Sequence, residues 1–400
     1  VDDWHAVDRS AMAQRAADLG AVDLRALDDA ALVAHRDAAL TLARDGLRIH
    51  FRLMMPLARR MHRLHRFVAD ELGWDDPTIA TMLSGHSPAT RAAADALTDL
   101  RARIRSVDGA VAALEAMPGR PIDALSRIDP SLADTLESWL AQHGWATINY
   151  DAGVPMLAER PTMVSRLLLA DPDDPDHTAA DEVAARARDA LAPERRMEFD
   201  EALADARAIY PVRDDNTIIV GDRPSALLRK WMVEVGRRLV ARGVLPASGD
   251  AAYLEVDELR AALAGGANVD LADRVAKRRG AEAWARAHPG PAYVGKQGSP
   301  PDTSRLPGPL RRVNEPILWL VSHEYPAPPT PPENADVVAS GVPASPGVVE
   351  GPVRVNRGHG DMDRLCEGDV LVCQITSPAW APLFALASAV VADGGGALSH

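Results

Sequence analysis

The 400-residue chain is too long for one ordinary hydrophobic core, so its length predicts two or three domains. Its 47% apolar and 25% charged residues exclude a wholly disordered chain, and its formal net charge of −13 argues against a general nucleic-acid binder, because phosphate repels an acidic surface. The longest apolar run, 382–392, is about half the roughly 20 residues that a membrane-spanning helix needs, and the N-terminus shows no cationic leader, so neither a membrane span nor a signal peptide is expected. Two cysteines, Cys366 and Cys373, match no zinc pattern and favour a reduced, cytoplasmic protein.

Helical patterns dominate the sequence from its start to about residue 290. Between residues 32 and 72 apolar side chains recur at spacings of three and four, and Gly73 follows as glycine commonly does past a helix end. Residues 224–242 give the clearest amphipathic helix, which Gly243 closes. Further helices are predicted at 88–107, 130–143, 160–169 and 181–210, and short strands only at 217–220 and 253–256. The pattern predicts a mostly α domain and disfavours a TIM barrel or a Rossmann domain.

The composition changes twice towards the C-terminus. Residues 288–312 are rich in Gly, Pro and Ser and are predicted to be a long loop. Five prolines between 326 and 332 favour a semi-rigid polyproline II spacer, so residues 326–338 are interpreted as a linker, with a surface loop as the alternative. A helical domain is therefore expected over 1–325, open to division into two subdomains.

The apolar period then changes to two, which is typical of strands. Strands are predicted at 348–355, 369–375 and 389–392, with a helix beginning near 377–378. Residues 339–400 are thus expected to form a small α/β module. Its size is marginal for independent stability, so the predicted fold is a large mostly α domain followed by an α/β domain that is incomplete at its C-terminus.

Four motifs in the module occur in a fixed order. They are Gly341-Val-Pro-Ala-Ser-Pro-Gly-Val-Val-Glu-Gly351, Gly368-Asp-Val-Leu-Val, Ile375-Thr-Ser-Pro-Ala-Trp-Ala-Pro-Leu-Phe384 and Ala389-Val-Val-Ala-Asp-Gly-Gly-Gly-Ala-Leu-Ser-His400. Together they resemble the β/β/α swivelling phosphohistidine domain of the phosphoenolpyruvate-utilising enzymes. The resemblance implies a phosphotransferase in which a mobile histidine carries the phosphoryl group.

The resemblance assigns His400 as the phosphorylated, catalytic residue. A neutral imidazole is a nucleophile, and glycines allow backbone N–H groups to approach a phosphate. Gly394, Gly395 and Gly396 are the expected phosphate cradle, and the hydroxyls that would hydrogen-bond nearby are those of Thr376 and Ser399. The alternative is a plain glycine turn with an exposed histidine. Because the sequence ends at His400, it is expected to be part of a longer protein and to be inactive in transfer by itself.

The domain order resembles the rifampin phosphotransferase branch of the family, where a helical acceptor-binding domain precedes the histidine domain. Weaker similarity lies in Trp139–Gly144, Leu157–Pro161 and Tyr210–Asn216. This resemblance implies a small-molecule hydroxyl acceptor, together with ATP and Mg²⁺ bound by an ATP-grasp domain in cis or in trans. The alternatives are a dikinase of the phosphoenolpyruvate synthase type and a non-catalytic ligand- or partner-binding module.

Three polar residues, Arg213, Asp215 and Asn216, follow a predicted helix and precede a predicted strand, where side chains often line a cleft. They are candidates for acceptor binding, with local capping as the alternative. His62 and His65 have a spacing suited to a metal, but no paired carboxylate accompanies them in the sequence, so no metal site is predicted.

Overall fold

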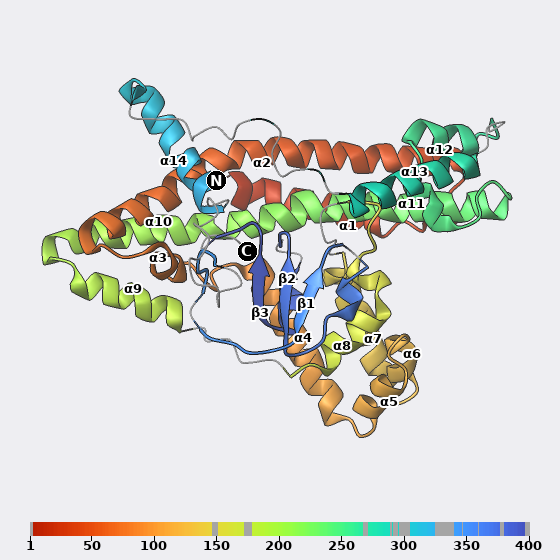
Figure 1. The fold of residues 1–400 in the computed structure, drawn as a ribbon, viewed down its shortest axis with the longest axis horizontal. Helices are drawn as coiled ribbons and strands as arrows, with labels where there is room; N and C mark the ends of the chain where they lie inside the picture. The colour runs from red at the N-terminus through yellow and green to blue at the C-terminus, as the bar shows by residue number, and fades with distance from the viewer. Residues whose placement is uncertain are drawn as a thin grey trace.

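The chain folds into an elongated helical body that carries a small three-stranded sheet (Figure 1). The structure is a computed structural model and describes residues 3–145, 151–171, 178–266, 271–288, 290, 295, 305–324, 340–345, 347–358, 360–376 and 380–396. The predicted fold class, a large mostly α domain followed by a small α/β domain, is confirmed. The predicted linker at 326–338 lies outside the described residues.

The body consists of α-helices and shorter helical turns. The α-helices are α1 (Arg9–Gly20), α2 (Asp29–Leu72), α3 (Asp76–Thr81), α4 (Pro88–Ser106), α5 (Ala110–Ala116), α6 (Pro121–Ser126), α7 (Pro130–His143), α8 (Pro161–Leu169), α9 (Ala179–Ala190), α10 (Arg196–Asp215), α11 (Arg223–Ala241), α12 (Val256–Leu263), α13 (Leu271–Ala287) and α14 (Gly308–Glu324). Two π-helices, η1 (Trp4–Asp8) and η5 (Asn216–Asp222), and the 3₁₀ turns η2 (Leu24–Ala26), η3 (Leu157–Glu159), η4 (Pro193–Arg195) and η6 (Ser248–Tyr253) complete it. Within the described residues, no helix combines the length and apolarity that crossing a membrane demands.

The long helix α2 is the axis of the body. It begins where the Asp28 side chain accepts a hydrogen bond from Ala31 N at 2.7 Å, and it ends at Gly73, whose φ of 65° is the left-handed conformation expected of a glycine cap. Its buried side chains include the predicted apolar stripe, which is Leu53, Leu57, Met61, Leu64 and Val68. This stripe packs in one core with α1, α10 and part of α14. Helices α11, α12 and α13 form a second core.

Two strand predictions in the helical part were wrong. Residues 217–220 lie inside η5, and the stretch 253–256 runs from the end of η6 to the start of α12. The β-branched run in η5 favours a strand by propensity, but Val220 packs so closely on Gly46 of α2 that a Cβ at Gly46 would lie 2.8 Å from Val220 Cγ1. Helix-on-helix packing therefore overrides the local preference.

Two further boundaries differ from the prediction. The single helix expected over 181–210 is divided into α9 and α10 by η4, where Pro193 occupies the first helical turn. The helix α14 begins at Gly308, inside the stretch 288–312 that was expected to be a loop, and most of the remainder of that stretch lies outside the described residues.

The C-terminal module contains a parallel sheet in the order β1-β2-β3, with β1 (Val353–Asn356), β2 (Asp369–Cys373) and β3 (Ala387–Ala392). The 3₁₀ turn η8 (Met362–Arg364) connects β1 to β2, and the short helix α15 (Ala381–Phe384) connects β2 to β3. The predicted strands at 369–375 and 389–392 are confirmed, whereas the first strand is limited to the end of the predicted 348–355 stretch. Since all strands are parallel, their carboxyl ends meet at one edge.

Candidate functional site

The carboxyl edge of the sheet carries most of the described residues that the sequence singled out. Asn356 of β1 pairs with Cys373 of β2, and Cys373 pairs with Ala392 of β3, so the three strand ends lie side by side. Ligands of parallel α/β sheets commonly bind at such an edge, because loops there diverge and leave a crevice.

The glycine turn leaves β3 at this edge. Asp393 N donates to Cys373 O at 3.1 Å, and Gly394 N donates to Gln374 O at 3.0 Å, which fixes the start of the turn on β2. Gly395 has a φ of 121°, a conformation that residues with a Cβ rarely adopt. The glycine is therefore required by the backbone at this position.

The other predicted residues of this edge are described only in part. Thr376 is half-buried and follows β2 by three residues, so it belongs to the same edge as the glycine turn. Ser399 and His400 lie outside the described residues.

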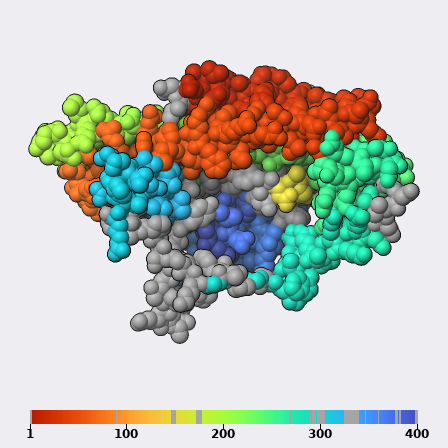
Figure 2. Space-filling model, turned by 90° about the horizontal axis from the view of Figure 1, so that it is seen from above, coloured from red at the N-terminus to blue at the C-terminus, as the bar shows by residue number. Residues whose placement is uncertain are grey.

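A cleft of about 840 Å³ opens between this edge and the helical body. The module contributes Asn356, Arg357 and Gly358 after β1, Cys373, Gln374 and Ile375 at the end of β2, and Trp380. Figure 2 shows the blue module at the base of a hollow, with the yellow 151–155 segment and the teal α13 beside it. The apolar part of the opposite wall includes Val154, Met232, Val233 and Tyr253.

Four arginines of the body line the same cleft, each joined to a carboxylate. Arg229 Nη2 donates to Glu159 Oε1 at 2.9 Å, Arg286 Nη2 donates to Glu282 Oε1 at 2.6 Å, and the remaining pairs are Arg278 with Glu258 and Arg279 with Asp250. A guanidinium has five donors, so one carboxylate does not exhaust its capacity to bind an oxyanion. The wall is thus suited to an organic molecule with anionic or hydroxyl groups.

One of these arginines, Arg286, lies close to the module. A Cβ built on Gly358 would come 2.8 Å from Arg286 Nη1, so the loop after β1 and the end of α13 touch across the cleft. The side chain of Arg286 is 53% exposed, which leaves it accessible to a ligand.

The module is held against the body by both charge and apolar contact. Arg160 Nη1 lies 2.9 Å from Asp363 Oδ1, Arg166 Nη1 donates to Leu365 O at 3.1 Å, and Asp171 N donates to Glu367 Oε1 at 3.0 Å. Side chains around α15 and of β2 share a hydrophobic core with α4, α7 and α8, and these are Leu371, Cys373, Trp380, Leu383 and Leu386. The structure therefore shows the module docked on the body.

The thiol at the strand edge is unsuited to nucleophilic chemistry. Burial raises the pKa of Cys373 to about 11, and the negative charge of Asp393 acts in the same direction. At neutral pH the thiol is protonated, and the thiolate that a nucleophile requires is scarce.

The three residues predicted to bind the acceptor lie together, but in another part of the molecule. Arg213 and Asp215 end α10 and Asn216 begins η5, and all three are buried. Arg9 Nε donates to Asp215 Oδ2 at 2.6 Å, and Asn216 Nδ2 lies 2.6 Å from His50 Nδ1. None of the three is among the described residues that line the cleft, and their role in acceptor binding stays a prediction.

Sequence patterns did not identify the cleft wall. Its arginines come from α11 and α13, and the 151–155 segment comes from a distant part of the chain. Each arginine by itself matches an ordinary solvated helix face, so only the packing of α11, η6 and α13 brings them together. No local spacing could have indicated this set.

A parallel sheet with a glycine turn at its carboxyl edge, docked beside an arginine-lined cleft, defines a small α/β domain on a helical body. The family described as "PEP-utilising enzyme, mobile domain" matches residues 365–400. The C-terminal module therefore carries the mobile domain of the PEP-utilising (phosphoenolpyruvate-utilising) enzymes, and the similarity of the chain to proteins named phosphotransferase and phosphoenolpyruvate synthase agrees with this assignment.

Three curated proteins illustrate the similarity. The uncharacterized phosphotransferase YvkC of Bacillus subtilis is 29% identical over 208 residues, which are 52% of this chain and 23% of that protein. Chondramide synthase cmdD of Chondromyces crocatus is 28% identical over 388 residues, 88% of this chain and 9% of that protein. Rifampicin phosphotransferase of Bacillus subtilis is 43% identical over 60 residues, 15% of this chain and 7% of that protein. The matched region thus spans less than a quarter of each of these relatives.

Proposed function

We propose that the chain comprises the acceptor-binding body and the histidine-bearing mobile domain of a phosphotransferase. His400 would carry a phosphoryl group from ATP to a hydroxyl of an organic molecule held in the cleft. The observation that best supports this proposal is the position of the sheet edge: Gln374, whose carbonyl holds the glycine turn, lines the cleft opposite Arg286.

The proposed reaction has two stages. In the first, the neutral imidazole of His400 attacks the β-phosphorus of ATP, the bond from this phosphorus to the oxygen of AMP breaks, and AMP and the imidazole proton leave. Water then attacks the γ-phosphorus of the histidine-bound pyrophosphoryl group, which releases phosphate and leaves one phosphoryl group on His400. In the second, the acceptor hydroxyl attacks the phosphorus on His400, the P–N bond breaks, and the hydroxyl proton passes to a cleft carboxylate, for which we propose Asp151.

The residues of the module and the body have separate proposed roles. The N–H groups of Gly395 and Gly396 would hold the phosphoryl oxygens, with the hydroxyls of Thr376 and Ser399 beside them. The N–H of Gly394, which was expected to take part, donates to Gln374 O and would instead fix the turn. Arg286 would neutralise the charge that develops on the phosphoryl group during transfer.

The acceptor is proposed to be a small organic molecule rather than a macromolecule. The cleft volume is within the range of small-molecule sites, and its wall combines apolar side chains with arginines. The similarity to rifampicin phosphotransferase favours rifampicin, or an organic molecule of similar kind, as the acceptor. Nucleotide binding with Mg²⁺ is assigned to an ATP-grasp domain in cis or in trans, outside these 400 residues.

Phosphorylation of His400 can be tested with ATP labelled at the β-phosphate and a protein that contains both the chain and its ATP-grasp partner. We expect label that is stable in base and labile in acid, and its loss in His400→Ala. His288→Ala, which removes an exposed histidine of the body, is the matched control and should label normally. Label that persists in His400→Ala would overturn the assignment.

The role of the cleft is tested separately with rifampin as the first acceptor. Arg286→Ala should label on His400 as the wild type does but transfer the phosphoryl group at least about 10-fold more slowly, because one charge-stabilising donor is lost. Arg260→Ala, an exposed arginine of α12, is the control. Equal transfer rates in the two variants would show that Arg286 does not take part in phosphoryl transfer.

A further inference from the structure

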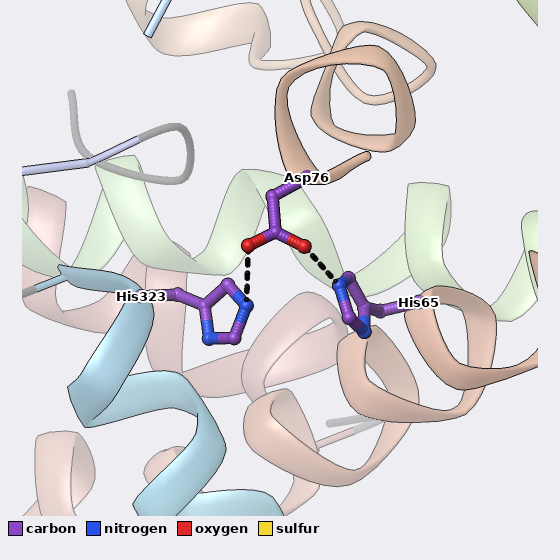
Figure 3. A group of neighbouring side chains, drawn as sticks. All are labelled: His65, Asp76 and His323. Carbon is purple, nitrogen blue, oxygen red and sulfur yellow. Dashed lines mark hydrogen bonds and ion pairs between the residues drawn. The ribbon is translucent and has the colours of Figure 1, made fainter. Parts of the chain in front are cut away.

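Two histidines and an aspartate from three different helices converge beside the body's main core (Figure 3). His65 comes from α2, Asp76 begins α3, and His323 lies in the last turn of α14. His65 Nε2 is 2.6 Å from Asp76 Oδ1, and His323 Nε2 is 3.0 Å from Asp76 Oδ2. The carboxylate therefore bridges the two imidazoles.

The hydrogen bonding of His323 places an electron pair in this cluster. Its Nδ1 lies 2.7 Å from the backbone carbonyl oxygen of Trp319, and a carbonyl can only accept, so Nδ1 carries the proton. In the neutral ring, Nε2 therefore carries no proton, and its lone pair faces the lone pairs of a carboxylate oxygen. Such a contact between two acceptors requires a cation between them or a positive charge on the ring. Metal-binding histidines are commonly oriented by a hydrogen bond of this kind from their other nitrogen.

A small cavity adjoins the three side chains. Its volume is about 10 Å³, which is roughly the space of one water-sized atom. Apart from the cluster itself, the described wall is apolar and consists of Met61, Leu64, Ile79, Ala80, Leu83 and Trp319. The cavity has room for one ion, but not for an ion that keeps a full shell of water molecules.

The donor set is the kind that divalent transition metals prefer. The donor atoms of the three side chains all lie within 4.8 Å of one another, and the imidazoles are 15% and 17% exposed while Asp76 is 47% exposed. Two imidazole nitrogens and one carboxylate leave a fourth tetrahedral position for water, as in many zinc sites. Asp76 provides a route of entry from solvent.

We infer that His65, Asp76 and His323 form a Zn²⁺ site that joins α14 to α2 and α3. The inference is independent of the proposed phosphotransfer. Its consequence for the fold is local: α14 ends at Glu324, directly before the predicted linker, so the ion would fix the base from which the mobile domain extends. The helix also packs on α2 through Leu320 and the ring of Trp319.

The test uses the whole chain, stripped with a chelator and then titrated with Zn²⁺ while bound metal is measured by mass spectrometry and calorimetry. We expect one tightly bound ion per chain and a higher melting temperature in the zinc-loaded form, because the ion binds the folded state. His323→Ala and Asp76→Asn should each weaken binding by about 10-fold or more. His62→Gln is the matched control, because His62 also lies on α2 against Trp319 but is not part of the cluster, and it should bind like the wild type.

A second readout does not depend on how the variants fold. Cobalt(II) bound to the wild-type chain should give the intense visible absorption of a four-coordinate ion, and Zn²⁺ should displace it. Absence of a stoichiometric ion, or binding by His323→Ala with wild-type affinity, would overturn the inference and leave a metal-free, hydrogen-bonded His–Asp–His cluster.

Discussion

Arg160 and Asp363 form an ion pair between the helical body and the C-terminal module. Arg160 Nη1 lies 2.9 Å from Asp363 Oδ1, and the arginine side chain is 7% exposed while that of Asp363 is 48% exposed. Because one partner is buried, the pair is less screened than a surface pair, and the loss of either charge leaves the other without compensation.

Asp363→Asn should shift the module towards an undocked state. Loss of a partly buried charge-assisted hydrogen bond costs about 1 kcal/mol, which changes the ratio of undocked to docked molecules about five-fold. Cys373 reports this opening because it is buried in the core that the module shares with the body. The measurement is the rate of Cys373 alkylation, with the rate of Cys366 in the same molecule as the internal control. An unchanged Cys373 rate would show that the ion pair does not hold the module.

The two thiols should differ strongly in the undisturbed protein. Cys366 is exposed, whereas burial raises the pKa of Cys373 to about 11. Relative to an ordinary thiol, this leaves about 100-fold less thiolate near pH 8, in addition to the steric protection. Timed labelling with iodoacetamide, followed by mass spectrometry of peptides, should therefore find Cys366 modified first and Cys373 only slowly. Equal rates would mean that the Cys373 environment is open to solvent.

Glu258 gives the chain a pH-dependent contribution to stability. Hydrogen bonds from Arg278, the backbone N–H of Glu255 and Arg274 hold the pKa of Glu258 at about 2, below its ordinary value of 4.5. Since the folded-state pKa is depressed, the contribution is fully present above pH 4.5 and is lost as the pH falls towards 2. Glu258→Gln should therefore cost about 1–2 kcal/mol at pH 7 through the lost cap and ion pairs, and less at pH 3.

Urea unfolding at pH 7 and at pH 3 measures this difference. The exposed Glu115→Gln is the control and should change the free energy of unfolding little at either pH. A Glu258→Gln effect of the same size at both values of pH would exclude the charge as its origin.

Local signals explain which parts of the fold were predictable. The end of α2 at Gly73 and the whole of α7 agree with the prediction, because caps, prolines and apolar spacing act within a few residues. The β-branched segment in η5 was wrongly predicted to be a strand, because the helix α2 on which it packs is distant in sequence. The His65, Asp76 and His323 cluster was missed for the same reason: of the two histidines singled out in the sequence only His65 belongs to it, and its other two members come from α3 and α14.

Substitution by alanine at two glycines inside helices should change the free energy of unfolding in opposite directions. At Gly236 of α11, a Cβ would lie 2.1 Å from Ser248 O and 2.9 Å from Ser248 C, and this contact is with backbone that cannot turn aside. Gly236→Ala should therefore cost about 3 kcal/mol by forcing α11 and η6 apart. At Gly280 of α13, nothing lies within 4 Å of the new Cβ, so Gly280→Ala should stabilise by about 0.5–1 kcal/mol through helix propensity alone. Urea midpoints of the two variants test the pair, and a neutral Gly236→Ala would contradict the close approach of α11 to η6.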